Sequence, residues 1–240
     1  MRTFFLLLIL TSISAVSNFA QSKVFHYDTF SVKLVNTKLN EYDRNNKIIY
    51  TRDFNSPQDF AVDLDGDGID ELLVNDSYTD SGKTYYTLYI FNTVDSLYLA
   101  DSIFSGLIEP YETKSDEAKG TIIVSGNPCI DSLNNDSDNI FLPVNCWKYD
   151  NGQLFLINDD LYKIFITEND NIIDYLDNFY LSNKKDCSST RKIKAAIASG
   201  YINYFHSGDK ILARQFIREY YLCNDAESFE QNLNKILKEK

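Results

Sequence analysis

The spacing of apolar residues changes once along this chain, and this change constrains the fold more than any other feature of the sequence. From Val24 to about Asn158, apolar residues alternate with polar ones or form short runs between turns, which is the pattern of β-strands. From about Asp170 they recur at helical spacing. Strands followed by helices predict an α+β fold. We therefore expect a β domain over residues 21–158 and a helical domain over residues 159–240.

The β domain is expected to be antiparallel. Asn151 and Gly152 lie between two strand-like segments and are typical of a two-residue hairpin turn. Residues 60–104 and 118–157 each have the size of one blade-like unit, and two such units are too few to close a propeller. The sequence thus predicts an antiparallel twisted sheet or a small sandwich of blade-like units. The expected strands cover residues 30–35, 47–51, 60–62, 72–74, 85–92, 97–104, 120–125, 140–150 and 153–157.

The C-terminal helices carry end signals. Gly208 is suited to terminate one helix, and Asp209 and Asp225 are suited to cap the N-termini of the next two. Short connections make such helices antiparallel neighbours, so we expect a stack of helical hairpins. The stack is expected to pack on the sheet, and a groove for a partner is the alternative.

Residues 63–71 form an acidic loop rich in glycine. Asp63, Asp65, Asp67 and Glu71 repel one another unless a cation lies between them. Oxygen ligands select a hard cation, and the flexible coordination sphere of Ca²⁺ suits a short loop better than the strict octahedron of Mg²⁺. We expect Ca²⁺ as the cofactor, with the backbone carbonyl of Ile69 as a further ligand. The alternative is an acidic turn without a cation.

The flanks of the acidic loop differ from those of an EF-hand. The position of the closing EF-hand glutamate is occupied by Val74, and apolar strand-like segments lie on both sides of the loop. Strand, acidic loop and strand in this order resemble the calcium loops of FG-GAP and VCBS-type repeats, which are similar to β-propeller blades. The resemblance covers one blade-sized unit and implies four side-chain ligands, one of them a glutamate where the family usually has aspartate. These are Asp63, Asp65, Asp67 and Glu71.

A second resemblance concerns residues 53–92. An acidic loop followed by a tyrosine-rich strand is similar to exported lysozyme inhibitors and immunity proteins. That resemblance implies loops that plug the cleft of a cationic, lysozyme-like cell-wall hydrolase. The formal net charge of −12 is complementary to such a partner.

The N-terminus is typical of a secretory signal peptide over residues 1–20. A positively charged start is followed by apolar residues 4–10 and by small and polar residues before Gln21. The apolar run is too short to span a bilayer. We expect an exported protein, periplasmic or secreted, with no membrane span. Its acidity argues against nucleic acid as a partner.

The four cysteines all follow the expected cleavage point. An even number in an exported chain predicts two disulfides, for which three pairings are possible. We favour Cys129 with Cys146, across a hairpin loop, and Cys187 with Cys223, between two helices. Zinc is disfavoured because no Cys-x-x-Cys pair is present.

Signals for catalysis are weak. The two histidines, His26 and His206, lie outside any recognisable nucleophile or metal motif. We therefore expect no enzyme, but an exported calcium-binding protein that acts as a binding module for an unknown protein or cell-envelope partner. The alternatives are a periplasmic inhibitor or immunity protein directed against a lysozyme-like hydrolase, and a carbohydrate-active enzyme.

Overall fold

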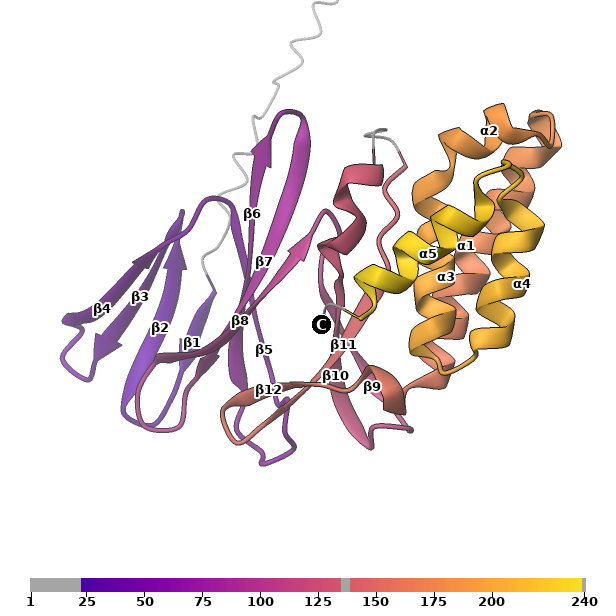
Figure 1. Cartoon of the computed structure of the whole chain (residues 1–240). Coiled ribbons are helices and arrows are strands. Elements are labelled where there is room, and N and C mark those ends of the chain that lie inside the picture. The colour runs from indigo at the N-terminus through magenta and orange to yellow at the C-terminus, as the bar shows by residue number, and fades with distance from the viewer. Residues whose placement is uncertain (1–22, 135–138, 239–240) are drawn as a thin grey trace, which may run out of the picture.

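The structure, a computed structural model, describes residues 23–134 and 139–238. The expected signal peptide, residues 1–20, lies outside the described residues. Three four-stranded antiparallel sheets follow one another along the chain, and α-helices come after them (Figure 1). The predicted α+β fold class is confirmed.

Each sheet is a meander in which strands that follow one another in the chain are neighbours. The first sheet contains β1 (Val24–His26), β2 (Phe30–Val35), β3 (Lys38–Asp43) and β4 (Ile48–Asp53). The second contains β5 (Pro57–Val62), β6 (Glu71–Asp80), β7 (Lys83–Asn92) and β8 (Tyr98–Gly106). The third contains β9 (Tyr111–Ser115), β10 (Gly120–Gly126), β11 (Val144–Asp150) and β12 (Gln153–Leu156).

The sheets and helices form successive layers (Figure 1). Successive side chains of a strand point to opposite faces, so the middle sheet contributes to two cores. Leu72 and Val74 pack with residues of the first sheet, whereas Leu73 packs with Ile123 of the third. The other face of the third sheet is covered by Phe165 and its neighbours on the first helix. Each sheet is thus buried against another layer.

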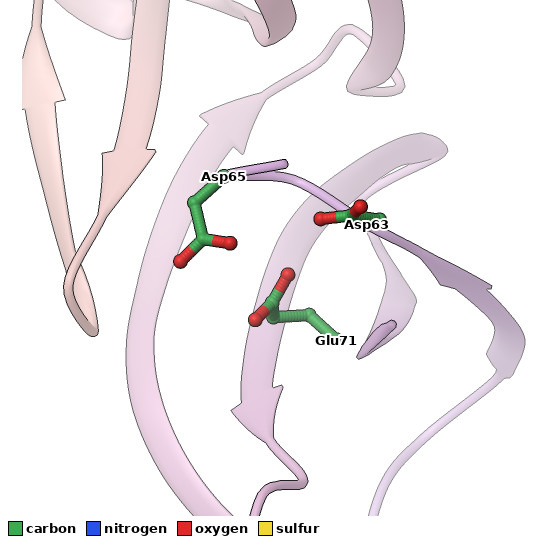
Figure 2. Close-up of side chains that lie close together, drawn as sticks. All are labelled: Asp63, Asp65 and Glu71. Carbon is green, nitrogen blue, oxygen red and sulfur yellow. The ribbon is translucent and has the colours of Figure 1, made fainter. Parts of the chain in front are cut away.

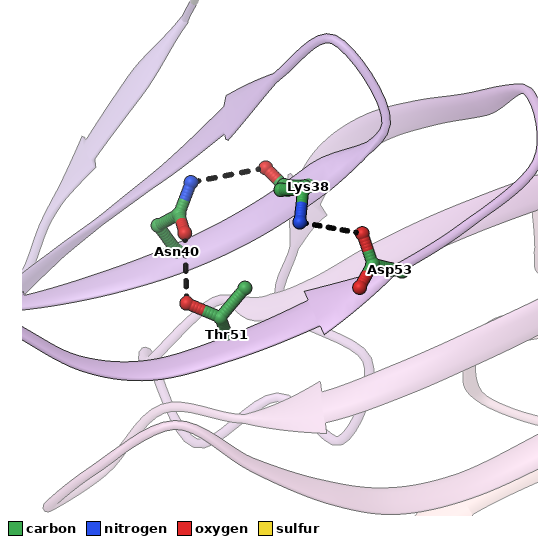
Figure 3. Close-up of polar contacts among 4 residues, drawn as sticks. All are labelled: Lys38, Asn40, Thr51 and Asp53. Carbon is green, nitrogen blue, oxygen red and sulfur yellow. Dashed lines mark hydrogen bonds and ion pairs between the residues drawn. The ribbon is translucent and has the colours of Figure 1, made fainter.

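Polar cross-strand pairs join β3 to β4 in the first sheet (Figure 3). Thr51 Oγ1 donates to Asn40 Oδ1 at 2.9 Å, and Asn40 Nδ2 donates to the carbonyl of Lys38 at 3.3 Å. An exposed ion pair joins Lys38 Nζ to Asp53 Oδ1 at 3.2 Å. In the β3–β4 register, Asn40 lies directly opposite Thr51, and Lys38 lies directly opposite Asp53.

The expected number of blade-sized units was wrong, because residues 24–53 form a further meander. Strand β3 was not predicted because its Lys-Leu-Asn-Glu-Tyr-Asp sequence lacks apolar alternation. It is nevertheless a central strand: Asn40 and Glu41 are buried, and both are satisfied by polar partners of other strands or loops. Strand β9 was missed for the same reason, since its sequence is Tyr-Glu-Thr-Lys-Ser.

The predicted hairpin turn at Asn151 and Gly152 is confirmed. It connects β11 to β12, and both residues have positive φ, 50° and 81° respectively. A two-residue hairpin turn of this kind requires positive φ at both central positions, which asparagine and glycine tolerate.

The helices begin earlier in the chain than predicted. Helix α1 (Tyr162–Ser182) starts in a β-branched and aromatic stretch that has weak helical propensity. Helix α2 (Cys187–Lys192) was not predicted; Asp186 caps it by accepting from Ser189 N at 3.0 Å. Among the described residues, no helix combines the length and apolarity needed to cross a membrane. The remaining helices are α3 (Lys194–His206), α4 (Lys210–Tyr220) and α5 (Ala226–Ile236).

Two of the three predicted end signals are confirmed. Gly208 follows α3 with φ of +84°, and Asp209 Oδ1 accepts from Leu212 N at 2.9 Å. Asp225 stands at the N-terminus of α5 but makes no side-chain cap bond. Its carboxylate instead accepts from the Tyr221 hydroxyl at 3.1 Å, so a tertiary contact replaces the local one.

One of the two predicted disulfides is formed. Cys187 and Cys223 are bonded, which ties α2 to the segment after α4. The predicted bond between Cys129 and Cys146 is absent. Cys146 lies in the core between the third sheet and α1, whereas Cys129 packs with the helical core, so the two belong to different layers. Burial raises the pKa of the Cys146 thiol to about 12, and this thiol stays protonated.

Candidate metal centre

The acidic loop connects β5 to β6 at one edge of the space between the second and third sheets. The two ends of the loop are held together where Val62, the last residue of β5, pairs with Glu71, the first residue of β6. Leu64, only 3% exposed, packs in the core between these sheets and anchors the loop. The predicted order of strand, acidic loop and strand is thus confirmed.

Three carboxylates of the loop converge on one point. Ligand oxygens of Asp63, Asp65 and Glu71 all lie within 4.8 Å of one another. Figure 2 shows the three groups directed toward a common space. Ca²⁺ binds oxygen at about 2.3–2.6 Å, so ligands on opposite sides of the ion are about 4.6–5.2 Å apart. The three oxygens are therefore close enough together to hold one metal ion.

Hydrogen bonds within the loop hold the aspartates in place. Asp63 Oδ1 accepts from Gly66 N at 2.7 Å, and its Oδ2 accepts from Gly68 N at 3.0 Å. Asp65 Oδ1 accepts from Asp67 N at 3.2 Å. Gly66 and Gly68 have φ of +83° and +89°, which residues with a side chain rarely adopt. The glycines of the motif thus let the backbone turn around the carboxylate of Asp63.

The fourth predicted carboxylate, that of Asp67, is not part of the cluster. Asp67 Oδ1 accepts from Ile69 N at 2.7 Å. The Ile69 side chain is exposed. Of the predicted side-chain ligands, the structure brings together Asp63, Asp65 and Glu71 but not Asp67.

Glu71 is the buried member of the cluster. It is 2% exposed, and its Oε2 accepts from Leu64 N at 3.0 Å. Burial raises the pKa of Glu71 to about 7, and the negative charges of Asp65 and Asp67 add to this effect. A buried carboxylate beside other carboxylates is electrostatically unfavourable, and a divalent cation would compensate for it.

A cleft of about 600 Å³ opens beside the acidic loop, between the second and third sheets. We call it the loop cleft. Its two walls are joined where Thr121 Oγ1 of β10 donates to the carbonyl of Asp63 at 3.5 Å. The charged residues that line it are Asp63, Asp65, Asp70, Lys114, Lys119 and Lys148. The three lysines could not be predicted from the sequence, because they belong to no motif and only the fold brings them to this cleft.

The histidines lie in separate environments. His206, at the end of α3, is 9% exposed and packs edge-on against Phe165 with ring centroids 5.5 Å apart. Its Nδ1 lies 3.3 Å from Asn158 Nδ2. His26 lies on β1 in the first sheet. Neither histidine belongs to the cluster of carboxylates.

Comparison of this chain with family models, with curated proteins and with solved structures gives no match. The geometry of the acidic loop and its cleft is therefore the basis for a proposed function.

Proposed function

We propose that this chain is an exported calcium-binding protein, in which Ca²⁺ bound by Asp63, Asp65 and Glu71 stabilises the acidic loop of an interaction module. One observation carries the proposal: three carboxylate oxygens, one of them on a buried glutamate, lie within 4.8 Å of one another on a glycine-containing turn. The N-terminal pattern of residues 1–20 supports export.

Calcium fits this site better than the commoner alternatives. The ligands are carboxylate oxygens, which disfavours zinc and other cations that prefer nitrogen or sulfur. Mg²⁺ demands an octahedron at about 2.0–2.1 Å and retains several waters. A loop whose oxygens are spread over several ångströms is more compatible with the larger and more flexible coordination sphere of Ca²⁺.

The test is thermal unfolding of the protein in EDTA, in millimolar Ca²⁺ and in millimolar Mg²⁺. We expect Ca²⁺ to raise the melting temperature, since a ligand that binds only the folded state stabilises it. Asp65→Asn should abolish the rise, because it removes a charged ligand. Asp174→Asn, at an exposed position of α1, is the matched control and should retain the rise. A wild-type protein that melts equally in EDTA and Ca²⁺ would refute the calcium site.

A second candidate function is inhibition of a cationic cell-wall hydrolase, and the β6–β7 hairpin favours it. The hairpin extends past its neighbours (Figure 1). Its Tyr78 and Tyr85 form a row of stacked rings with Phe104 of the adjacent strand β8, with centroids 5.3 and 6.4 Å apart. Tyr78 and Phe104 are 43% and 47% exposed, and exposed aromatic rings of this kind are frequent in binding sites.

Inhibition is tested by adding increasing amounts of the protein to a lysozyme that is degrading cell walls. We expect the lysis rate to fall, and the double variant Tyr78→Ser/Phe104→Ser to weaken this inhibition. Val94→Ser, at an exposed apolar position after β7, is the control and should inhibit like the wild type. Unchanged lysis at a large excess of wild-type protein would exclude inhibition of that enzyme.

A further inference from the structure

We propose that the loop cleft binds an anionic ligand, one that carries carboxylate or phosphate groups, and that it does so together with the calcium ion. This inference rests on the proposed calcium site and adds the chemistry of a ligand to it. The carrying observation is that three lysines line the same cleft as Asp63 and Asp65, two members of the cluster of carboxylates.

The three lysines come from separate elements of the third sheet. Lys114 lies on β9, directly opposite Thr121 in the register with β10, and Thr121 contacts the acidic loop. Lys119 precedes β10, and Lys148 lies on β11. All three lysines line the loop cleft beside the acidic loop.

These lysines are not neutralised by the carboxylates across the cleft. Among the described residues, none of the three has its ammonium nitrogen within 4.0 Å of a carboxylate oxygen. Lys148 Nζ donates to the carbonyl of Ala118 at 3.3 Å, which leaves its charge uncompensated. The ammonium groups remain available to a bound anion.

Cation binding changes the charge of the cleft. Its lining contains three carboxylates and three ammonium groups, so their formal charges cancel. A divalent cation at Asp63, Asp65 and Glu71 adds two positive charges and Glu71 adds one negative charge, so the occupied cleft is net positive by one charge. In a chain with a net charge of −12, this cleft becomes a place that attracts anions, and its walls concentrate the field.

Coordination chemistry points in the same direction. Ca²⁺ takes six to eight oxygen ligands, and three carboxylates leave positions for water or for ligand oxygens. A carboxylate or phosphate oxygen can occupy such a position while the lysines balance the remaining charge. A volume of about 600 Å³ is that of a site for a small molecule or a short oligosaccharide.

The experiment is isothermal titration calorimetry of the protein with three ligands, each in Ca²⁺ and in EDTA. Trigalacturonate carries carboxylates, glucose 1-phosphate carries a phosphate, and maltotriose is the uncharged control. We expect at least one charged ligand to bind in Ca²⁺, and its affinity to fall about 5- to 150-fold in EDTA, the usual range of coupling between two sites. Which of the two binds identifies the source of the anionic group. Maltotriose should not bind.

The variants separate this inference from the calcium site. Lys114→Gln/Lys119→Gln should lose binding of the charged ligand and retain the calcium-dependent rise in melting temperature. Lys33→Gln/Lys47→Gln removes the same charge from the first sheet and should bind like the wild type.

The possible failures are distinguishable. A calcium-dependent rise in melting temperature without binding of either charged ligand overturns the anion site alone. Equal binding by Lys114→Gln/Lys119→Gln and the wild type also overturns it, as does equal binding of maltotriose. A wild-type protein without any calcium-dependent rise overturns the calcium site and, with it, the coupled binding.

Discussion

At the scale of single residues, two glutamates are similarly buried but have different surroundings. Glu71 and Glu41 are 2% and 3% exposed, and each accepts a hydrogen bond from one backbone N–H, of Leu64 and Leu97 respectively. Burial raises the pKa of both carboxyls. Glu71 lies beside further carboxylates, where a cation would offset its cost. Glu41 is not part of that cluster, and its burial reduces stability once it ionises.

Glu41→Gln should change how stability depends on pH. The pKa of Glu41 is raised in the folded state, so the folded protein binds this proton more tightly than the unfolded chain does. Ionisation of Glu41 therefore costs stability as the pH rises above the ordinary pKa of a glutamate, about 4.3. The melting temperature of the variant relative to the wild type should increase as the pH rises above this value, because glutamine retains an acceptor and carries no charge.

The measurement is a series of thermal melts at increasing pH, from this value upward. Glu112→Gln, at an exposed position of β9, is the matched control. A difference between Glu41→Gln and the wild type that stays constant with pH would show that burial of this carboxylate does not control the pH dependence.

At the scale of elements, the second and third sheets are in close contact where β8 and β10 end. A Cβ at Gly126 would collide with the carbonyl oxygen of Ser105. Ser105 Oγ also accepts from Gly126 N at 2.8 Å and donates to the carbonyl of Ile108 at 2.6 Å. This contact joins one end of β10 to the second sheet, and Thr121 near the other end contacts the acidic loop.

Gly126→Ala should destabilise the protein by about 1–3 kcal/mol, the usual cost of forcing extra atoms into a packed interior. Gly120→Ala is the matched control on the same strand, because a Cβ there meets no atom within 4 Å and the backbone is not left-handed. Urea unfolding of the two variants measures the difference. Equal stability of the two would contradict a tight contact between the sheets at Gly126.

At the scale of the whole molecule, the chain is a stack of layers, and each layer depends on its neighbours. The helical core includes three residues from connecting segments. Leu107 follows β8, Ile130 follows β10, and Leu142 precedes β11. The helices therefore pack on the segments that connect the strands, and Phe165 of α1 packs on the third sheet itself. The Cys187–Cys223 disulfide closes the outermost layer across 36 residues.

Removal of this disulfide should lower the free energy of unfolding by about 3–4 kcal/mol, as expected for a loop of this length. Cys187→Ala/Cys223→Ala, compared with the wild type by urea unfolding, tests this. A reducing agent should lower the stability of the wild type toward that of the variant and leave the variant unchanged. No effect of reductant on the wild type would show that the bond contributes little.

The sequence by itself determined those features that depend on neighbouring residues. The change from strand to helix spacing, the turn at Asn151 and Gly152, the cap at Asp209 and the placement of the acidic loop between two strands all follow from local chemistry. Half-buried strands with polar sequences, such as β3, were missed because their buried side chains are satisfied by residues far along the chain.

Only the tertiary structure decided which residues share a layer and a site. It separated Cys129 from Cys146 by placing them in different cores, and it left Asp67 outside the cluster formed by Asp63, Asp65 and Glu71. It also brought the lysines of the third sheet to the acidic loop of the second. The physical reason is that the packing of whole sheets against one another sets these distances, and no local pattern in the sequence encodes that packing.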